Sequence, residues 1–302
     1  MRESGGLDIS GILLVDKPPG MTSHDVVAGV RKLIRPVRVG HTGTLDPLAT
    51  GLLILCIGKA TRIADLLQSE HKVYRASVLL GVRTETQDIE GAVLEQRPAG
   101  QIPIERIEEA ARFFTGSIAQ KPPQFSAVKI GGIRAYRLAR RHEKVSLEPR
   151  RIEIRRFQIE EVRLPSIEFV VECSKGTYVR TLCSDFGDRL GAGGCMQSLR
   201  RLSIGRFSVA DAVPFAQLAE AGDVVKNVLP LPQALAHLPN VVCTDEQSER
   251  ILHGMRIPAG GRFEAHEGWV SASAPDGRVL AVGKLTREGE EIFFQPRKVL
   301  SS

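Results

Sequence analysis

The sequence predicts an α+β fold, in which a mixed, largely antiparallel central sheet is flanked by helices and followed by a small, mostly β C-terminal domain. Strand-like and helix-like segments are mixed along the chain without the regular alternation of a parallel α/β protein. The composition changes near residues 230–240, and several short β-like runs follow. We therefore expect a large domain over residues 1–236 and a small one over residues 237–302.

The large domain begins with a strand, a helix and a second strand. The apolar residues 12–15 precede a turn at residues 17–20, after which hydroxyl residues offer an N-cap. Apolar residues then recur at helical spacing until Pro36 stops the helix. Residues 38–51 (RVGHTGTLDPLATG) have the composition of a loop, and the apolar run 52–58 predicts a fully buried strand.

The later elements follow from the same rules of periodicity and capping. In the large domain we expect a helix around 63–67, a strand over 72–80, a helix that begins at Pro103, a loop over 121–132, a basic helical stretch to 144, strands near 151–159 and 167–173, and a helix over 177–190. In the small domain we expect a short helix over 246–252 and the β-like runs GWVSASA, VLAVGKL and EIFFQPRKVL.

Charge and cysteine content narrow the class of protein. The net charge is +6, and residues 236–302 hold 8 Lys+Arg against 9 Asp+Glu, so the basic excess lies in the large domain. A basic face suits a phosphate-bearing partner, although a solubilising charge balance is the alternative. The five cysteines form no CxxC, and no histidine spacing indicates a metal. No apolar run is long enough to span a bilayer, so we expect a reduced, cytoplasmic protein.

The loop GHTGTLDPLATG is the most informative segment for chemistry. It holds His41 and Asp46 between glycines, just before the buried strand, and can present the carboxylate of Asp46 from a rigid base. The alternative is a structural Asx-turn, because Asp before Pro often only shapes a turn.

Three further segments carry candidate functional residues. Tyr178 and Arg180 lie in the first turn of the helix predicted over 177–190, where a strand end leads into a helix N-terminus. Tyr74 lies on a predicted strand, and Lys17 lies in the turn KPPG. Each has a plain structural alternative: a core aromatic, a solvated charge or a turn residue.

Taken together, these segments resemble the TruB family of transfer RNA pseudouridine synthases. The likeness covers nearly the whole chain as blocks in family order: GILLVDKPPGMTSHDVV, RVGHTGTLDPLATGLLILCIGKATR, KVYRASVLLGVRTETQD, PPQFSAVKIGGIRAYRLAR, CSKGTYVRTLCSDFGDRLG and SLRRLSIGRF. The C-terminal segment is more loosely similar to the PUA domain, a small RNA-binding module. The resemblance implies a pseudouridine synthase fold and the isomerisation of uridine 55 in the TΨC arm of tRNA, without cofactor or metal.

The resemblance also implies catalytic roles. The target uridine would be flipped out of the folded RNA arm. Asp46 would act as the nucleophile, with attack on the sugar or on the base left open. Arg180 would pair with Asp46 and keep it charged. Tyr74 would stack on the flipped uracil.

Other residues match substrate-binding positions of the family. His41 would fill the space that the flipped base leaves, and Tyr178 would line the pocket. Leu199 would contact the substrate, and Lys17 would support the pocket without taking part in the chemistry.

The basic stretch over residues 129–144 is expected to grip RNA as a thumb. Its Arg134, Arg137 and Arg141 would hold phosphates, with a solvated helix face as the alternative. The expected partner is tRNA, bound by a monomer that does not associate with membranes. Two other classes stay open: an RNA-folding module without essential catalysis, and a subunit of a guide-RNA complex.

Overall fold

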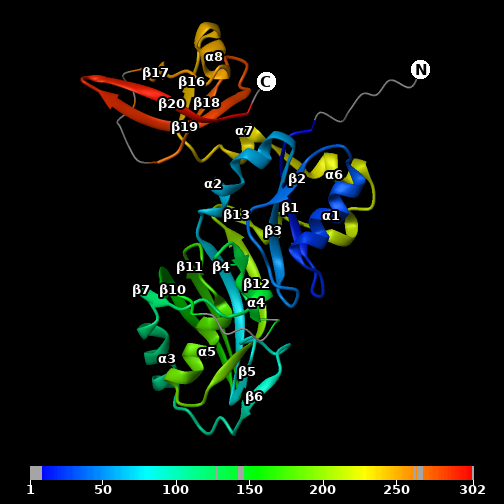
Figure 1. Cartoon of the computed structure of the whole chain (residues 1–302), viewed down its shortest axis with the longest axis vertical. Helices are drawn as coiled ribbons and strands as arrows, with labels where there is room; N and C mark the ends of the chain where they lie inside the picture. Colours follow the sequence, from blue (N-terminus) through cyan, green and yellow to red (C-terminus); the bar gives the residue numbers. More distant parts are fainter. Residues whose placement is uncertain are drawn as a thin grey trace.

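The computed structural model describes residues 9–126, 128–139, 141, 146–260, 263 and 268–300, apart from four side chains between 129 and 136. Within these residues, eleven strands form one large sheet and five strands near the C-terminus form a second sheet (Figure 1). Both parallel and antiparallel pairs occur in the large sheet, and the antiparallel pairs predominate. The predicted α+β class is therefore confirmed.

The large sheet has the strand order β14-β1-β3-β12-β4-β11-β10-β7, with β2 and β15 paired to β3 and β1, and β13 to β12. These strands are β1 (Gly11–Lys17), β2 (Val39–His41), β3 (Thr50–Ile57), β4 (Lys72–Leu80), β7 (Gly116–Gln120), β10 (Arg150–Arg163), β11 (Ser166–Cys173), β12 (Gly194–Ile204), β13 (Phe207–Ser208), β14 (Val213–Pro214) and β15 (Val228–Pro230). The helices are α1 (Ser23–Leu33), α2 (Ala64–Gln68), α3 (Ile104–Phe113), α4 (Ala135–Ala139), α5 (Val179–Arg189), α6 (Ala221–Asn227), α7 (Leu231–Ala234) and α8 (Asp245–Leu252), with a 3-10 helix η1 (Gly58–Ile63) before α2.

The half of the sheet that contains β1 and β3 is buried on both faces. Leu53 and Leu55 of β3 pack with α1 on one face, while Leu52 and Ile54 pack on the other face with α2 and the C-terminal sheet. A strand with two buried faces needs apolar residues at every position, which explains the unbroken run predicted as a buried strand. Thr22 caps α1 through a capping box.

The other half of the sheet is covered on one face only. Helices α3 and α5 pack there on β4, β10 and β11, around a cluster of phenylalanines that includes Phe157 and Phe186 (Figure 1). The opposite face carries polar side chains, among them Arg75, which pairs with Glu160 at 2.8 Å. A sheet with one solvated face has alternating apolar and polar residues, as β4 does.

The second sheet has the order β16-β18-β19-β20-β17 and packs with α8 around its own core. Its strands are β16 (Asn240–Val242), β17 (Ile257–Pro258), β18 (Val270–Ser273), β19 (Val279–Glu288) and β20 (Glu291–Val299). It lies against the end of the large sheet near α2 and α7 (Figure 1). Val282 and Leu300 join the apolar cluster around α2 and α7, and Lys298 pairs with Asp65 of α2. The two parts therefore share a packed interface.

Several local predictions were wrong or incomplete. The expected loop 38–51 begins with the short strand β2, and the loop 121–132 contains β8 (Lys129–Ile130), which pairs with β9 (Ile133–Arg134). The basic helical stretch contains only the five-residue α4, and residues 140 and 142–145 lie outside the described residues. The strand pair β5 (Val82–Thr84) and β6 (Val93–Gln96) was not predicted. The described residues include no helix that is both long and apolar enough to cross a membrane.

Strand β12 was also missed, although it joins the two halves of the sheet. It runs parallel to β3 through Arg201 and Gly51, and antiparallel to β4 along its length. Gly51 has a φ of +97°, and a Cβ there would lie 2.3 Å from the carbonyl oxygen of Arg201. Only glycine allows the two backbones to approach this closely.

We predict that Gly51→Ala lowers the free energy of unfolding by about 2–5 kcal/mol, because backbone strain and overpacking add at this position. Gly20→Ala is the matched control, since Gly20 also has a positive φ of +79° but has no atom within 4 Å of the added Cβ. It should cost about 1–2 kcal/mol. Urea unfolding measures both variants, and equal losses would contradict the close approach of β3 and β12.

Candidate active site

Asp46 projects from the loop between β2 and β3, and this loop is held from the side of α1. The Ser23 hydroxyl accepts a hydrogen bond from the Leu45 N–H at 2.8 Å and lies 3.2 Å from the Leu45 carbonyl, to which it donates. Within the loop, the Ala49 N–H donates to the Asp46 carbonyl at 3.1 Å. Ser23 is buried, so these bonds fix the backbone next to Asp46 without competition from water.

The Asp46 carboxylate pairs with the guanidinium of Arg180, which comes from α5. The Nε of Arg180 lies 2.9 Å from Oδ2 of Asp46, and Nη2 lies 3.5 Å from Oδ1. Arg180 also donates to the carbonyls of Thr86 at 3.1 Å and Phe125 at 2.9 Å. The Arg180 side chain is 9% exposed, whereas that of Asp46 is 37% exposed. The guanidinium is thus a fixed anchor, and the carboxylate stays accessible to a substrate.

The pKa of the Asp46 carboxyl is raised above its ordinary value by burial, although the positive charge of Arg180 opposes the rise. Asp88 adds to it, since its buried carboxylate lies 3.7 Å from Nη1 of Arg180 and shares this cation with Asp46. The pairing predicted from the sequence is present. Arg180 reduces the upward pKa shift of Asp46 but does not reverse it.

Tyr74 lies on β4 with its side chain on the face that α5 covers. It is buried, opposite Arg201 on β12 and Val171 on β11. Burial raises the pKa of the Tyr74 phenol, although the positive charge of Arg201 opposes the rise, and nearby Asp46 adds a smaller upward contribution. The phenol is therefore protonated at neutral pH and offers its ring to a neighbouring base.

Tyr178 is the N-cap residue of α5, two residues before Arg180. The side-chain amide of Gln120 binds the Tyr178 backbone twice, accepting from its N–H at 2.8 Å and donating to its carbonyl at 3.0 Å. Burial raises the pKa of the Tyr178 phenol. Strand β7, which ends at Gln120, thereby fixes the start of the helix that carries Arg180.

Lys17 is fully buried and binds backbone carbonyls. Its Nζ donates to Pro18 at 2.8 Å, Met21 at 2.7 Å and Pro47 at 3.3 Å. Burial lowers its pKa to about 8, with Asp46 opposing the change. Because Pro47 directly follows Asp46, Lys17 links the end of β1 to the loop that carries the carboxylate.

His41 and Leu199 border this loop on different strands. His41 ends β2, its Nδ1 accepts from the Gly43 N–H at 3.2 Å, and burial lowers its pKa, which favours the neutral ring. Leu199 lies on β12 opposite Ala76 and is 8% exposed. It belongs to the same apolar cluster as Leu45 and Tyr74.

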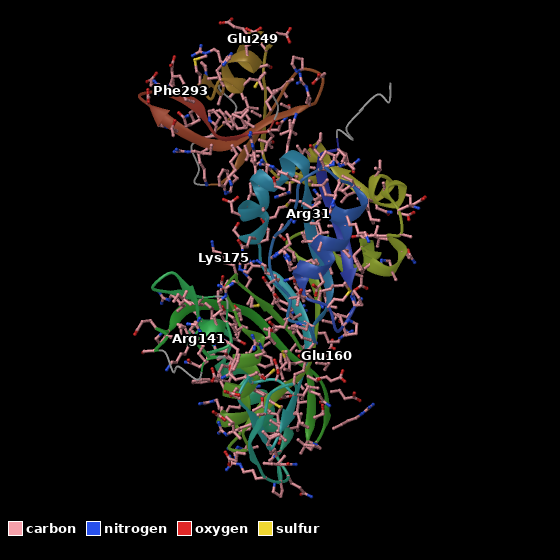
Figure 2. The ribbon with its side chains drawn as sticks, turned by 45° about the vertical axis from the view of Figure 1, so that its right-hand side comes forward. Arg31, Arg141, Glu160, Lys175, Glu249 and Phe293 are labelled. Carbon is pink, nitrogen blue, oxygen red and sulfur yellow. The ribbon has the colours of Figure 1, made fainter. Side chains whose placement is uncertain are left out.

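The predicted thumb residues are exposed where the structure describes them. Arg137 on α4 and Arg141 just after it are both solvent-accessible, and Figure 2 shows Arg141 on the half of the molecule that contains β10. The side chain of Arg134 lies outside the described residues. No carboxylate pairs with Arg137 or Arg141 in the described part of the chain.

Arg201 was missed by the sequence analysis although it is the largest fully buried side chain described. Its Nε donates to the Leu52 carbonyl at 2.7 Å, and its Nη2 lies 3.4 Å from the Gly43 carbonyl. It thereby joins the two ends of the loop that carries Asp46. Successive side chains of a strand point to opposite faces of the sheet. If residues 194–204 had been recognised as a strand, the pair Arg200-Arg201 would have indicated that one of the two arginines points to the core.

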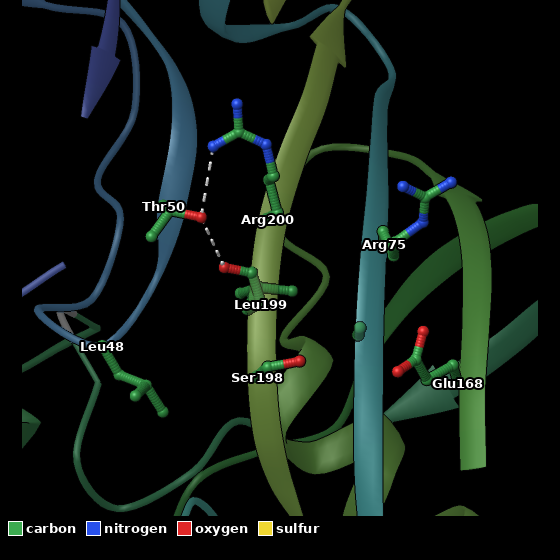
Figure 3. Close-up of a pocket in the computed structure, with 8 residues that line it drawn as sticks. Leu48, Thr50, Arg75, Glu168, Ser198, Leu199 and Arg200 are labelled. Carbon is green, nitrogen blue, oxygen red and sulfur yellow. Dashed lines mark hydrogen bonds between the residues drawn. The ribbon is translucent and has the colours of Figure 1, made fainter. Parts of the chain in front are cut away.

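A small pocket borders this site, because Leu199, Leu48 and Thr50 are among the residues that line it (Figure 3). Arg75 and Arg200 line it, opposite each other on β4 and β12, whereas their neighbours Tyr74 and Arg201 point to the face of α5. Arg200 is committed to Asp16, with its two contacts at 2.7 and 3.0 Å. Among the described residues, no cluster of His, Cys, Asp or Glu side chains could hold a metal ion.

We predict that Arg201→Met lowers the free energy of unfolding by about 1–3 kcal/mol, because the buried Leu52 carbonyl loses its hydrogen-bond donor. The control is Arg200→Met, whose side chain is 40% exposed. It should cost less than about 1 kcal/mol. Denaturant titration compares the two, and equal costs would contradict a supporting role for Arg201.

Comparisons with known proteins identify the family of this chain. Residues 31–179 match the model of the TruB family pseudouridylate synthase N-terminal domain, and residues 180–238 match the tRNA pseudouridylate synthase B C-terminal domain. The chain is 44% identical over 261 residues to the tRNA pseudouridine synthase B of Syntrophus aciditrophicus (strain SB), covering 85% of this chain and 83% of that protein. It is 44% identical over 283 residues to that of Thermobifida fusca (strain YX), covering 91% and 94%.

Two solved structures have a similar fold. A chain in the structure of an H/ACA RNP bound to a substrate RNA containing 2'-deoxyuridine aligns with a TM-score of 0.74 and 24% identity, covering 97% of this chain and 85% of that one. A chain in a Cbf5-Nop10-Gar1 complex aligns with a TM-score of 0.73 and 26% identity, covering 96% and 85%. Sequence and fold lead to one conclusion: the chain belongs to the TruB family of pseudouridylate synthases and is an enzyme of the isomerase class.

Proposed function

We propose that this enzyme converts uridine 55 in the TΨC arm of tRNA to pseudouridine, with Asp46 as its nucleophile. The observation that carries the proposal is the accessible Asp46 carboxylate held by the buried guanidinium of Arg180. The relatives named tRNA pseudouridine synthase B support tRNA as the substrate.

The reaction rearranges one nucleoside without a net change in composition. The bond between N1 of uracil and C1′ of ribose breaks, the uracil turns, and a bond forms between C5 and C1′. The hydrogen leaves C5 and N1 gains a proton, so the product is an isomer and no oxidant or reductant is consumed. The task of the protein is therefore to detach, hold and rotate the base while water is excluded.

The target base must first leave its stacked position in the folded arm, at a cost of a few kcal/mol. Tyr74 supports a stacking role, because its ring is held on a rigid strand beside Asp46. Tyr178 and the apolar Leu199 would line the pocket, and neutral His41 would fill the space that the base leaves.

Asp46 acts as the ionised carboxylate, and attack at the sugar or at the base fits this role equally. Arg180 favours the charged form and fixes the direction of the carboxylate through its own bonds to two carbonyls. Lys17 and Arg201 hold the loop backbone on either side, and we assign them no part in the chemistry.

We also propose that residues 129–144 grip the RNA backbone and that residues 237–302 form a PUA-like RNA-binding domain. Exposed, unpaired arginines favour phosphate contacts over base readout. The enzyme would act in the cytoplasm, as a monomer and without cofactor.

We predict that Asp46→Asn lowers turnover by at least about 10⁴-fold, because an amide cannot serve as the nucleophile. The assay measures tritium release from tRNA transcript labelled at C5 of uracil, since pseudouridine formation must expel that hydrogen. Asp188→Asn is the control. Asp188 lies farther along α5 than Arg180, is exposed and pairs with Arg83 of β5. It should retain release.

Each other outcome of this assay has a definite meaning. Full release by Asp46→Asn would exclude Asp46 as the nucleophile. No release by the wild type, with tight tRNA binding intact, would favour an RNA-folding module or a guide-dependent subunit over the stand-alone enzyme.

The thumb is tested by replacing Arg137 and Arg141 together with Ala. We expect weaker tRNA binding. The salt slope, which is the slope of the logarithm of the binding constant against the logarithm of the salt concentration, should fall in magnitude by up to about two, one for each lost phosphate contact. The control replaces Arg106 and Arg163, which are exposed on α3 and at the end of β10. Equal slopes in the two double variants would rule out direct phosphate contacts by the thumb.

A further inference from the structure

Three arginines surround a pocket between the end of α1 and the start of β2. Its lining residues are Arg31, Arg35, Pro36, Val37, Arg38, Val39, Gly40 and Thr61. Its volume is about 440 Å³, which exceeds the size of a phosphate group. The three guanidinium-bearing side chains are solvent-accessible, while the floor is formed by the strand β2 and by η1.

The backbone under these arginines is held in place. Arg31 donates through Nη2 to the Val39 carbonyl at 3.0 Å, which joins α1 to β2. The Arg38 carbonyl accepts from the Gly58 N–H at 2.8 Å, and Ile34 beside Arg35 is fully buried. The arginines therefore extend from a fixed frame around the pocket, and little backbone ordering would accompany binding of an anion.

The positive charge of this region is not neutralised within the described chain. Residues 26–64 contain the basic residues Arg31, Lys32, Arg35, Arg38, Lys59 and Arg62. The single acidic residue in that span is Asp46, which is paired with Arg180. No described carboxylate forms an ion pair with Arg31, Arg35 or Arg38.

The helix dipole explains only part of this concentration of charge. Basic residues in the last turn of a helix interact favourably with its C-terminus, which accounts for Arg31 and Lys32. Arg35 and Arg38 lie beyond the end of α1 at Leu33, so the dipole gives no reason for them.

The pocket lies at the opposite end of β3 from the Asp46 loop. Val39 pairs with Ile57, whereas the loop joins β3 at Thr50, so the two sites are separated by roughly 20 Å along the strand. In Figure 2, Arg31 lies on the half of the molecule near the C-terminal sheet, and Arg141 lies on the other half. The pocket is thus separate from both the catalytic loop and the thumb.

We propose that this pocket binds backbone phosphates of the substrate RNA, several nucleotides away from the uridine that is modified. The proposal rests on the proposed function for the identity of the RNA. Arginine binds phosphate through two parallel N–H donors, and three arginines around one concavity suit the consecutive phosphates of a backbone. Such contacts set the register of the RNA and carry no sequence information.

The test replaces Arg35 and Arg38 with Gln and leaves Arg31, which has a structural bond, unchanged. Arg106→Gln with Arg163→Gln removes the same charge elsewhere and is the matched control. For each protein, the affinity for full-length tRNA is measured across a salt series, together with tritium release. We expect the salt slope to fall by about one to two for the pocket variant and not for the control. We also expect its KM to rise at unchanged kcat.

Two results would overturn the proposal. A salt slope equal to that of the control would show that the substitutions had only lowered the net positive charge of the protein and had removed no direct phosphate contact. A fall in kcat at saturating tRNA, with the slope unchanged, would assign these arginines to the support of the Asp46 loop. Absence of tritium release by the wild type would count against the proposed function alone, because the slope is measured on binding. Thermal unfolding verifies that both double variants fold.

Discussion

The ion pair between Asp46 and Arg180 is the interaction on which the arrangement of this site depends. A carboxylate that is partly removed from water tends to take up a proton, and its pKa is raised here. The guanidinium opposes that tendency only while it stays within 2.9 Å of the carboxylate. Both partners must therefore be held rigidly, although they lie 134 residues apart.

The structure holds each partner through a different part of the fold. Arg180 is fixed by two carbonyls and by α5, which packs on β4 and β11 through a cluster of buried phenylalanines. Asp46 is fixed through its neighbours, because Ser23 binds Leu45 and Lys17 binds Pro47. Strand β12 connects these two supports, since it pairs with β3 on one side and with β4 on the other.

Buried cations stabilise the backbone around this loop. The loop makes few regular hydrogen bonds of its own, so its carbonyls require donors from elsewhere. Lys17 and Arg201 supply them at Pro47, Gly43 and Leu52. Their desolvation is costly, and the lowered pKa of Lys17 reflects that cost. The charge of Lys17 also favours the ionised form of Asp46, so this residue supports both the geometry and the charge of the site.

The sequence by itself determined the α+β class, the buried strand β3, the capped helix α1 and the grouping of Asp46, Tyr74, Tyr178 and Arg180 into one family pattern. These features depend on local periodicity, on capping and on ordered motifs, which are written along the chain. Only the tertiary structure decided that β12 joins the two halves of the sheet, that Arg201 closes the Asp46 loop and that Asp88 shares Arg180 with Asp46. Each of these depends on strand order and side-chain direction across large separations in sequence, and hydrophobic periodicity carries no information about which strands become neighbours.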